Sequence, residues 1–306
     1  MIKHLVISGG GIWGLTCYGA LKETEKSGLW NIENIESIYS TSVGSIVSVI
    51  LALNYDWQTI DDFLIKRPWH QVFKFDIYSL LSAVEKRGIF DKTVIVELFE
   101  PLFKGKDISL EITLKEFYEL THIDFHCFST EINGQINGHS QKMTKVDFSH
   151  QSFPDWKLLD AVYCSCCLPI LFSPFLYDVS DSQFQCYIDG GILNNYPLVD
   201  CIQNVENTDE IFGIAKKTVD QPTTVGKTSS IFDFLLFFFG KVVREIENPY
   251  PEIVNQLNMN SSSTNLYDIY FTASSLEERM KLIRLGEEAG KNYIDSLLSQ
   301  TVDKLV

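Results

Sequence analysis

Two apolar segments near the N-terminus each run into a cluster of small residues, and this arrangement restricts the fold more than any other feature. Residues 5–7 (Leu-Val-Ile) lead into 8–14 (Ser-Gly-Gly-Gly-Ile-Trp-Gly), and residues 35–39 lead into 40–45 (Ser-Thr-Ser-Val-Gly-Ser). Strands that alternate with helix-like segments in this way are typical of an α/β protein with a mainly parallel sheet. The first cluster offers bare backbone N–H groups, and the second offers a serine at the end of a strand.

The remainder of the chain continues the alternation of strands and helices. For all 306 residues we expect a single α/β domain, with a motif-bearing core at about 4–217 and a helical C-terminal part at about 230–306. Residues 123–130 and 141–146 read as a hairpin, and the Thr, Ser, Pro and Gly content of 221–230 indicates a linker. A capping box of Ser275 and Glu278 predicts the start of the last helix.

Charge and composition exclude several classes of protein. The formal net charge is −15, which argues against nucleic-acid binding and against docking on an anionic membrane through charge alone. The longest apolar run, 234–239, is far shorter than the roughly 20 residues that a membrane span needs. The N-terminus does not resemble a secretory signal peptide. We therefore expect a cytoplasmic protein with, at most, peripheral membrane contact.

Seven cysteines are present, three of them within 164–167. Their number is odd, and no histidine or second cysteine pair stands at zinc-binding spacing. We expect reduced, mostly buried thiols and no metal site.

The glycine loop allows more than one interpretation. Gly9, Gly11 and Gly14 fit the G-x-G-x-x-G fingerprint of dinucleotide-binding proteins. In those proteins an acidic residue ends the second strand, whereas here Glu33 and Glu36 stand at its start or before it. A tight turn without a ligand is a second alternative. The interpretation we favour is an oxyanion site, because consecutive glycines let backbone N–H groups converge without interfering side chains.

Ser42 has the surroundings of a nucleophile elbow. Such a turn needs small residues two positions before and after the serine, because neighbouring backbone comes close. Gly44 meets one requirement, and Ser40 stands where glycine is usual. The alternative is that Ser42 only caps the following helix, since serine is favoured at that position.

Asp189 is the best candidate for the base that a serine nucleophile requires. It ends an apolar segment and precedes Gly190 and Gly191, whereas no histidine lies in a recognisable strand-end loop late in the chain. In a parallel sheet the carboxyl ends of the strands share one edge, so Asp189 and Ser42 could meet there. Alternatively, these residues form only an Asp-Gly turn.

Together the segments 9–14, 40–44, 160–169 and 189–197 occur in the order found in one family, and the chain resembles the patatin-like phospholipases. The resemblance implies a three-layer α/β fold and a Ser–Asp dyad, with Ser42 as nucleophile and Asp189 as base. It also implies an oxyanion hole and a set of supporting glycines. The oxyanion donors would be the backbone N–H groups of Gly10, Gly11 and Trp13, and the supporting residues Gly9, Gly14, Gly44, Gly190 and Gly191.

The implied activity is that of a lipid acyl hydrolase cleaving fatty-acyl esters of phospholipids, a phospholipase A-type reaction that needs no metal or cofactor. The implied partners are a phospholipid or other lipid ester, a membrane surface contacted peripherally, and an unspecified protein activator. Two departures from the family motifs leave an alternative open. Trp13 replaces the usual Arg or Lys, and Ser40 replaces glycine. A catalytically weak lipid-binding or partner-binding protein with the same fold is therefore the second hypothesis.

Residues 230–239 form the most apolar segment, with Lys241 and Arg244 just after it. Apolar runs of this length usually belong to the core, so a buried helix beside the active site is expected. Our hypothesis is that it borders the acyl-chain channel, and a lipid-facing position is the alternative.

Overall fold

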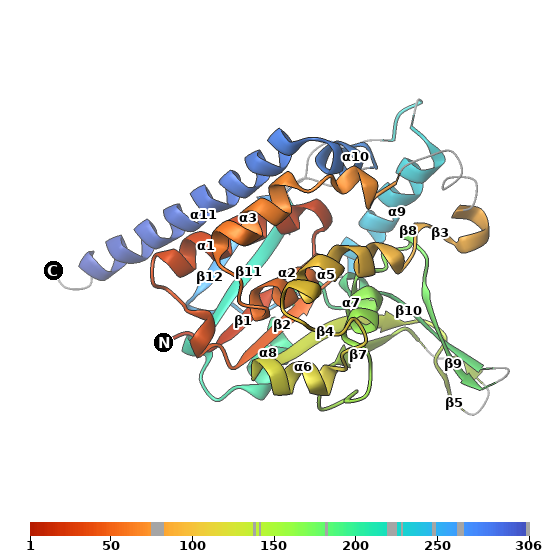
Figure 1. The fold of residues 1–306 in the computed structure, drawn as a ribbon, viewed down its shortest axis with the longest axis horizontal. Helices are drawn as coiled ribbons and strands as arrows, with labels where there is room; N and C mark the ends of the chain where they lie inside the picture. The colour runs from red at the N-terminus through yellow and green to blue at the C-terminus, as the bar shows by residue number, and fades with distance from the viewer. Residues whose placement is uncertain are drawn as a thin grey trace.

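A mostly parallel sheet flanked by helices forms the centre of the protein (Figure 1). The computed structural model describes residues 1–306 except 75–82, 137–138, 141, 181–182, 219–224, 228, 247–248, 262–265 and 304–306. Within this part the sheet has eight strands, and seven of them follow the order β12-β11-β1-β2-β4-β10-β9 while β7 pairs with β4. The parallel strands are β12 (Gln256–Ser261), β11 (Ile211–Thr218), β1 (His4–Ile7), β2 (Ser37–Thr41) and β4 (Asp124–Glu131).

Three antiparallel strands complete the sheet beside β4, namely β7 (Thr144–Phe148), β9 (Phe175–Ser180) and β10 (Gln183–Asp189). The antiparallel pairing of β4 with β7 agrees with the predicted hairpin, although residue 141 lies outside the described part. The predicted mainly parallel sheet is confirmed. Residues 221–224 and 228 of the expected linker also lie outside the described residues.

The direction of β10 corrects one step of the sequence argument. Asp189 was expected at the carboxyl edge of a parallel sheet, but β10 runs antiparallel to β4. Thr41 at the end of β2 pairs with Phe128, and Asp189 at the end of β10 pairs with the next residue, Ser129. Strands β2 and β10 therefore meet end to end along β4, and this junction brings Asp189 close to the residue after Thr41.

Helices cover both faces of the sheet and make three layers. The larger core lies between one face and α1 (Gly14–Lys26), α2 (Val43–Ala52), α5 (Thr93–Gly105) and α7 (Leu158–Cys166). On the other face, α8 (Leu198–Asn204) covers a smaller core. Neighbouring strand residues alternate between the two cores, as Leu5 and Val6 show.

The remaining elements surround these layers. The longer ones are α3 (Trp57–Lys66), α6 (Leu114–Thr121), α9 (Ile231–Ile246), α10 (Leu266–Ser274) and α11 (Leu276–Asp303). The short ones are β3 (Gly88–Phe90), β8 (Ile170–Phe172), β5 (Gln135–Ile136), β6 (His139–Ser140), η1 (Gly11–Trp13), η2 (Ile32–Asn34), η3 (Trp69–Gln71), η4 (Gly190–Ile192) and η5 (Thr208–Glu210). Ser275 precedes α11, and its hydroxyl accepts the Glu278 N–H at 3.1 Å, which is one half of the predicted capping box.

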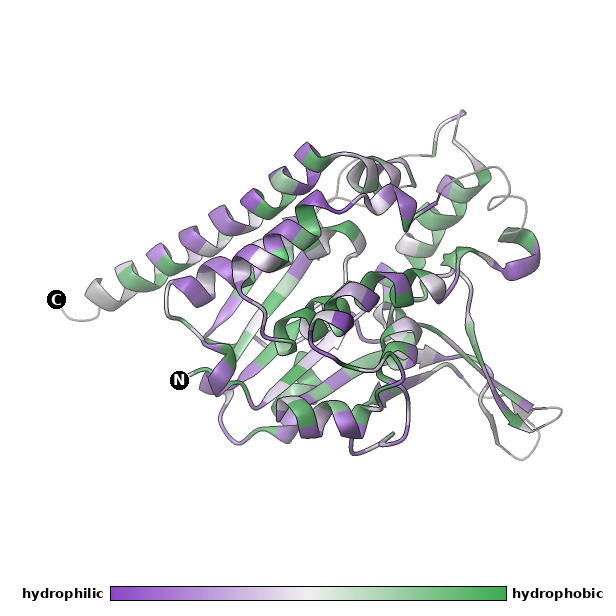
Figure 2. Ribbon diagram, in the orientation of Figure 1, coloured by the Kyte–Doolittle hydropathy of each residue, from purple (hydrophilic) through white to green (hydrophobic). Residues whose placement is uncertain are grey.

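The apolar segment after residue 230 is the clearest error of the sequence analysis. It forms α9, and no residue of that helix is buried. Phe234 is 43% exposed and Phe238 is 58% exposed. Figure 2 shows α9 largely in the hydrophobic colour although it lies at the periphery of the fold. The expectation of a buried helix is therefore wrong, because the neighbouring elements cover only part of its surface.

The seven cysteines are all buried and unpaired, as expected. Among the described helices, none combines the length and apolar character needed to cross a lipid bilayer.

Candidate active site

Ser42 occupies a strained turn between β2 and α2. Its backbone angles are φ 55° and ψ −130°, and a positive φ is costly for a residue with a Cβ atom. The turn projects the serine from the end of the strand as an elbow does. Strain of this kind persists only where surrounding contacts hold it, and it clusters at functional sites.

The residues on either side of the elbow explain how the turn fits. A Cβ atom on Gly44 would lie 2.6 Å from the Ile7 carbonyl oxygen, so this position requires glycine. Ser40, where glycine was expected, is fully buried, and its hydroxyl donates to the His126 carbonyl oxygen at 3.2 Å. The extra oxygen of Ser40 is thus satisfied within the sheet.

Asp189 contacts Ser42 directly, although the two residues are 147 positions apart. The Ser42 hydroxyl donates to Asp189 Oδ2 at 2.6 Å, and Asp189 Oδ1 accepts the Gly191 N–H at 2.7 Å. The carboxylate is only 4% exposed. Burial raises the pKa of Asp189 to about 6, although the hydrogen bonds from Ser42 and Gly191 act against this shift. A carboxylate with such a pKa is ionised at neutral pH and is more basic than an exposed aspartate.

The glycines predicted to support the site have neighbouring backbone or side-chain atoms where a Cβ atom would lie. A Cβ atom on Gly190 would lie 2.0 Å from the Phe128 carbonyl oxygen, and one on Gly191 would lie 2.9 Å from Asp189 Oδ1. A Cβ atom on Gly9 would lie 3.0 Å from Ser42 Cβ, and one on Gly14 would lie 2.3 Å from Val43 Cγ2. Larger residues at Gly9 or Gly14 would push the glycine loop away from the elbow.

The glycine loop lies beside Ser42. Gly11 has φ 60°, and it lines the same cavity as Ser42. Among the hydrogen bonds of the described residues, none uses the N–H of Gly10 or Gly11. The Trp13 N–H, by contrast, donates to the Gly10 carbonyl oxygen at 3.3 Å. The indole of Trp13 is buried, so a charged side chain at this position would lie in the core.

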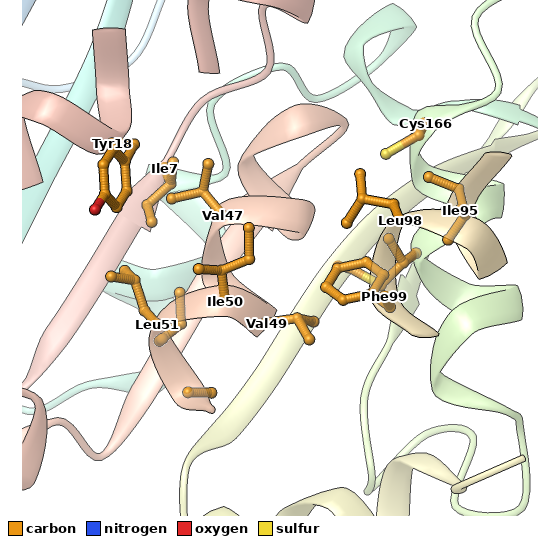
Figure 3. Close-up of a cluster of buried hydrophobic side chains, with 14 of the residues drawn as sticks. Ile7, Tyr18, Val47, Val49, Ile50, Leu51, Ile95, Leu98, Phe99 and Cys166 are labelled. Carbon is orange, nitrogen blue, oxygen red and sulfur yellow. The ribbon is translucent and has the colours of Figure 1, made fainter. Parts of the chain in front are cut away.

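An apolar cavity of about 200 Å³ opens at Ser42. Most of its walls come from α1, α2, α5, β8 and α10, with single side chains from other elements, and most of the side chains that line it are apolar. Figure 3 shows Val47 and Ile50 of α2 close to Leu98 of α5, with Cys166 nearby. No residue of α9 lines this cavity, so the hypothesis that the 230–239 segment borders the channel is not supported.

Two further residues, which lie in the family-like segments 160–169 and 189–197, also reach the site. The Ser165 hydroxyl accepts the Ser42 backbone N–H at 2.9 Å. Asn195 accepts the Gly9 N–H through its carbonyl oxygen at 3.0 Å. Their places just before Pro169 and just after Gly191 were the only sequence signals for them.

Several known proteins are similar to this chain in sequence or in fold. The model of the family "Patatin-like phospholipase" matches residues 5–202. "Probable lipid hydrolase 463L" of Invertebrate iridescent virus 6 is 29% identical over 198 residues, covering 64% of this chain and 62% of the viral protein. "Uncharacterized protein YqhO" of Bacillus subtilis (strain 168) is 21% identical over 305 residues, covering 96% of this chain and 97% of the relative.

The crystal structure of VipD from Legionella pneumophila has a similar fold, with a TM-score of 0.54 at 17% identity over 96% of this chain and 67% of VipD. The match covers less than two thirds of the length of the viral hydrolase, so the activity of the viral protein is not assigned to this chain. The family match covers more than half of the chain and contains both Ser42 and Asp189. The protein therefore belongs to the patatin-like phospholipase family.

Proposed function

We propose that this protein is a lipid acyl hydrolase that cleaves fatty-acyl esters of phospholipids through a Ser42–Asp189 dyad. The observation that carries the proposal is the 2.6 Å hydrogen bond from the Ser42 hydroxyl to a buried carboxylate, beside an apolar cavity. The apolar walls suit an acyl chain, because a hydrocarbon gains free energy on leaving water. Membership of the patatin-like phospholipase family supports the choice of a lipid ester.

In the proposed reaction Ser42 Oγ attacks the ester carbonyl carbon while Asp189 Oδ2 takes the hydroxyl proton. The N–H groups of Gly10 and Gly11 stabilise the tetrahedral oxyanion, and Trp13 contributes less because its N–H already donates to Gly10. Asp189 then protonates the departing alcohol, leaving an acyl group on Ser42. A water molecule that gives its proton to Asp189 attacks this acyl-enzyme, and Asp189 passes the proton to Ser42 Oγ as the bond between Ser42 and the fatty acid breaks.

Labelling with a fluorophosphonate, followed by lipid analysis, tests the proposal. The wild-type protein should be labelled at Ser42 and should release fatty acids from mixed phospholipid liposomes. Ser42→Ala should lose both properties while it stays folded. If the wild type is not labelled under conditions that label a control serine hydrolase, the hydrolase proposal fails and the lipid-binding or partner-binding alternative is favoured.

We also propose that the apolar surface of α9 contacts the lipid surface. The helix packs against β8, which lines the cavity, and against η4, which directly follows Asp189. Its exposed Phe234 and Phe238 stack on each other with ring centroids 6.4 Å apart. An exposed apolar helix so close to the cavity is positioned to insert among lipids without spanning the bilayer.

Liposome flotation of a Phe234→Asp, Phe238→Asp double variant tests this contact. The variant should bind liposomes more weakly and hydrolyse them more slowly, while its activity on a water-soluble ester stays unchanged. Phe184→Asp is the matched control, because Phe184 is 47% exposed but belongs to β10. Equal flotation of the wild type and the double variant would contradict the proposed role of α9.

A further inference from the structure

One short segment holds both members of the proposed dyad. Ser165 accepts the Ser42 backbone N–H at 2.9 Å, and its own hydroxyl donates to the Phe128 carbonyl oxygen at 2.6 Å. Two residues later, the Cys167 carbonyl oxygen accepts the Asp189 backbone N–H at 3.0 Å. The end of α7 and the residue after it thus touch the nucleophile on one side and the base on the other.

We propose that residues 164–167 act as a dyad clamp and that Ser165 is a positioning residue for Ser42. This inference rests on the proposed function, because it concerns the geometry of the same Ser42–Asp189 pair. It assigns a task to a cysteine-rich segment whose thiols take no part in the proposed reaction.

Serine is well suited to the position of Ser165. Its hydroxyl is both a donor and an acceptor, so the bond donated to Phe128 turns a lone pair of the same oxygen toward the Ser42 N–H. Ser165 is fully buried, and water therefore does not replace its hydroxyl when the side chain is shortened. The Ser42 elbow has a positive φ and depends on contacts of this kind to keep its conformation.

Neighbouring hydrogen bonds fix the clamp to the strand that carries the base. The Ser129 hydroxyl shares its single proton between the Cys164 and Ile188 carbonyl oxygens, each of which lies 2.9 Å away. The Cys167 thiol donates to the Tyr187 carbonyl oxygen at 3.2 Å. Because these contacts connect the segment to β10 directly before Asp189, a shift of Ser42 away from Ser165 would also be a shift away from Asp189.

Ser165 does not line the cavity, although its neighbour Cys166 does, and this separates the effect of changing Ser165 from an effect on the cavity. Removing the Ser165 hydroxyl should displace Ser42 Oγ relative to Asp189 Oδ2 while the apolar walls stay in place. We therefore expect the chemical step to slow while substrate binding changes little.

The experiment compares Ser165→Ala and Ser165→Cys with a matched control. Thr24 is also fully buried, and its hydroxyl accepts the Trp30 indole N–H at 3.0 Å and donates to the Ala20 carbonyl oxygen at 2.8 Å. Thr24→Val removes the same kinds of hydrogen bond at a site that does not line the cavity. For each folded variant, the rate of fluorophosphonate acylation is measured together with kcat and KM on a soluble short-chain ester.

Acylation and kcat should fall about 100-fold in Ser165→Ala, the loss that a small misplacement of a reacting group causes, while KM stays within about threefold. Ser165→Cys has a side chain of similar size, but its thiol forms only weak hydrogen bonds, so its acylation rate should also fall. This variant serves as the test if Ser165→Ala does not fold. Thr24→Val should lower the melting temperature but keep the wild-type rates.

Wild-type acylation rates in both Ser165 variants, or an equal loss in Thr24→Val, would overturn the clamp. A wild-type protein whose Ser42 does not react at all would instead overturn the proposed function, and the clamp with it.

Discussion

At the scale of one residue, the burial of Asp189 that makes it a better base for the candidate activity also lowers the stability of the folded protein. Its carboxylate is buried, and its pKa is raised to about 6. The folded state therefore binds a proton at Asp189 more tightly than the unfolded chain does. It follows that stability falls as the pH rises from about 4 to about 6, because the folded protein must then hold a buried charge.

Asp189→Asn should therefore stabilise the protein while it abolishes most of the activity. At pH 7 the free energy of unfolding should rise by on the order of 2 kcal/mol, since the buried charge is gone. Without a base, kcat should fall by about 10²–10⁴-fold. Urea unfolding at pH 7 and pH 4 measures the first effect, and the difference from wild type should disappear at the lower pH. A variant less stable than wild type at pH 7 would contradict this explanation.

The rate of hydrolysis should depend on the same titration. Asp189 acts as a base only when it is ionised, so kcat/KM for a soluble ester should rise with pH through about 6 and level off above it. A pH–rate profile between pH 4.5 and 8, recorded with an uncharged ester, measures this dependence. Full activity at pH 5 would show that a carboxylate with this pKa is not the base.

At the scale of an element, β4 carries a second buried charge in addition to joining β2 to β10. His126 Nδ1 bonds Asp147 Oδ2 at 2.8 Å, and its Nε2 lies 3.2 Å from Asp124 Oδ2. The His150 Nδ1 lies 2.9 Å from the other oxygen of Asp124, and Tyr39 stacks on the His126 ring. Burial alone would lower the pKa of His126, but the two carboxylates outweigh it and raise the pKa to about 9.

The charged His126 should stabilise the strand over a defined pH range. Because the folded pKa lies above the unfolded value, the stabilisation is complete below about pH 6.5 and is lost as the pH rises through about 9. The loss should reach up to about 3 kcal/mol in the free energy of unfolding. Urea unfolding at pH 7 and pH 9.5 measures it, and His126→Gln should show a much smaller difference between these two values. An equally large difference in His126→Gln would assign the effect to other groups.

At the scale of the whole molecule, the C-terminal helix is packed closely on the helix that follows the glycine loop. A Cβ atom on Gly286 of α11 would lie 1.9 Å from the Thr16 carbonyl oxygen, and one on Gly19 of α1 would lie 2.1 Å from the Ile283 carbonyl oxygen. The buried Lys22 ammonium adds ion pairs with Asp61 of α3 at 2.8 Å and with Glu287 of α11 at 2.5 Å. These contacts support our proposal that residues 1–306 form one domain, although the family match ends at residue 202.

Gly286→Ala should separate α11 from α1 and destabilise the whole protein. The added methyl group would collide with backbone, which has little freedom to move, so we expect a loss of about 1–3 kcal/mol in the free energy of unfolding. Gly240→Ala is the matched control, because Gly240 also lies inside a helix and has open space around its Cα. Thermal unfolding of both variants measures the difference. A Gly286→Ala variant as stable as Gly240→Ala would show that the helices can move apart freely.

The parts of this protein that the sequence determined by itself are those with local steric requirements. A strand end followed by a glycine loop, and a serine followed two residues later by Gly44, can be read directly because a side chain at Gly44 would collide with the Ile7 backbone, one at Gly14 would collide with Val43, and Gly11 has a positive φ. The alternation of strands and helices predicted the α/β class, and the resemblance of the ordered motifs to one family pointed to Ser42 and Asp189 as candidate residues. The predicted roles of these residues remain proposals.

Only the tertiary structure decided the features that depend on strand register and on packing between distant segments. Strand β10 runs antiparallel to β4, and Asp189 reaches Ser42 because the ends of β2 and β10 meet along β4. The tertiary structure also left α9 exposed and placed the Ser165 hydroxyl on the Ser42 N–H, 123 residues away. Such contacts are selected by the free energy of the complete fold, since the choice of a hydrogen-bond partner or a covering surface far along the chain leaves no periodic signal in the sequence.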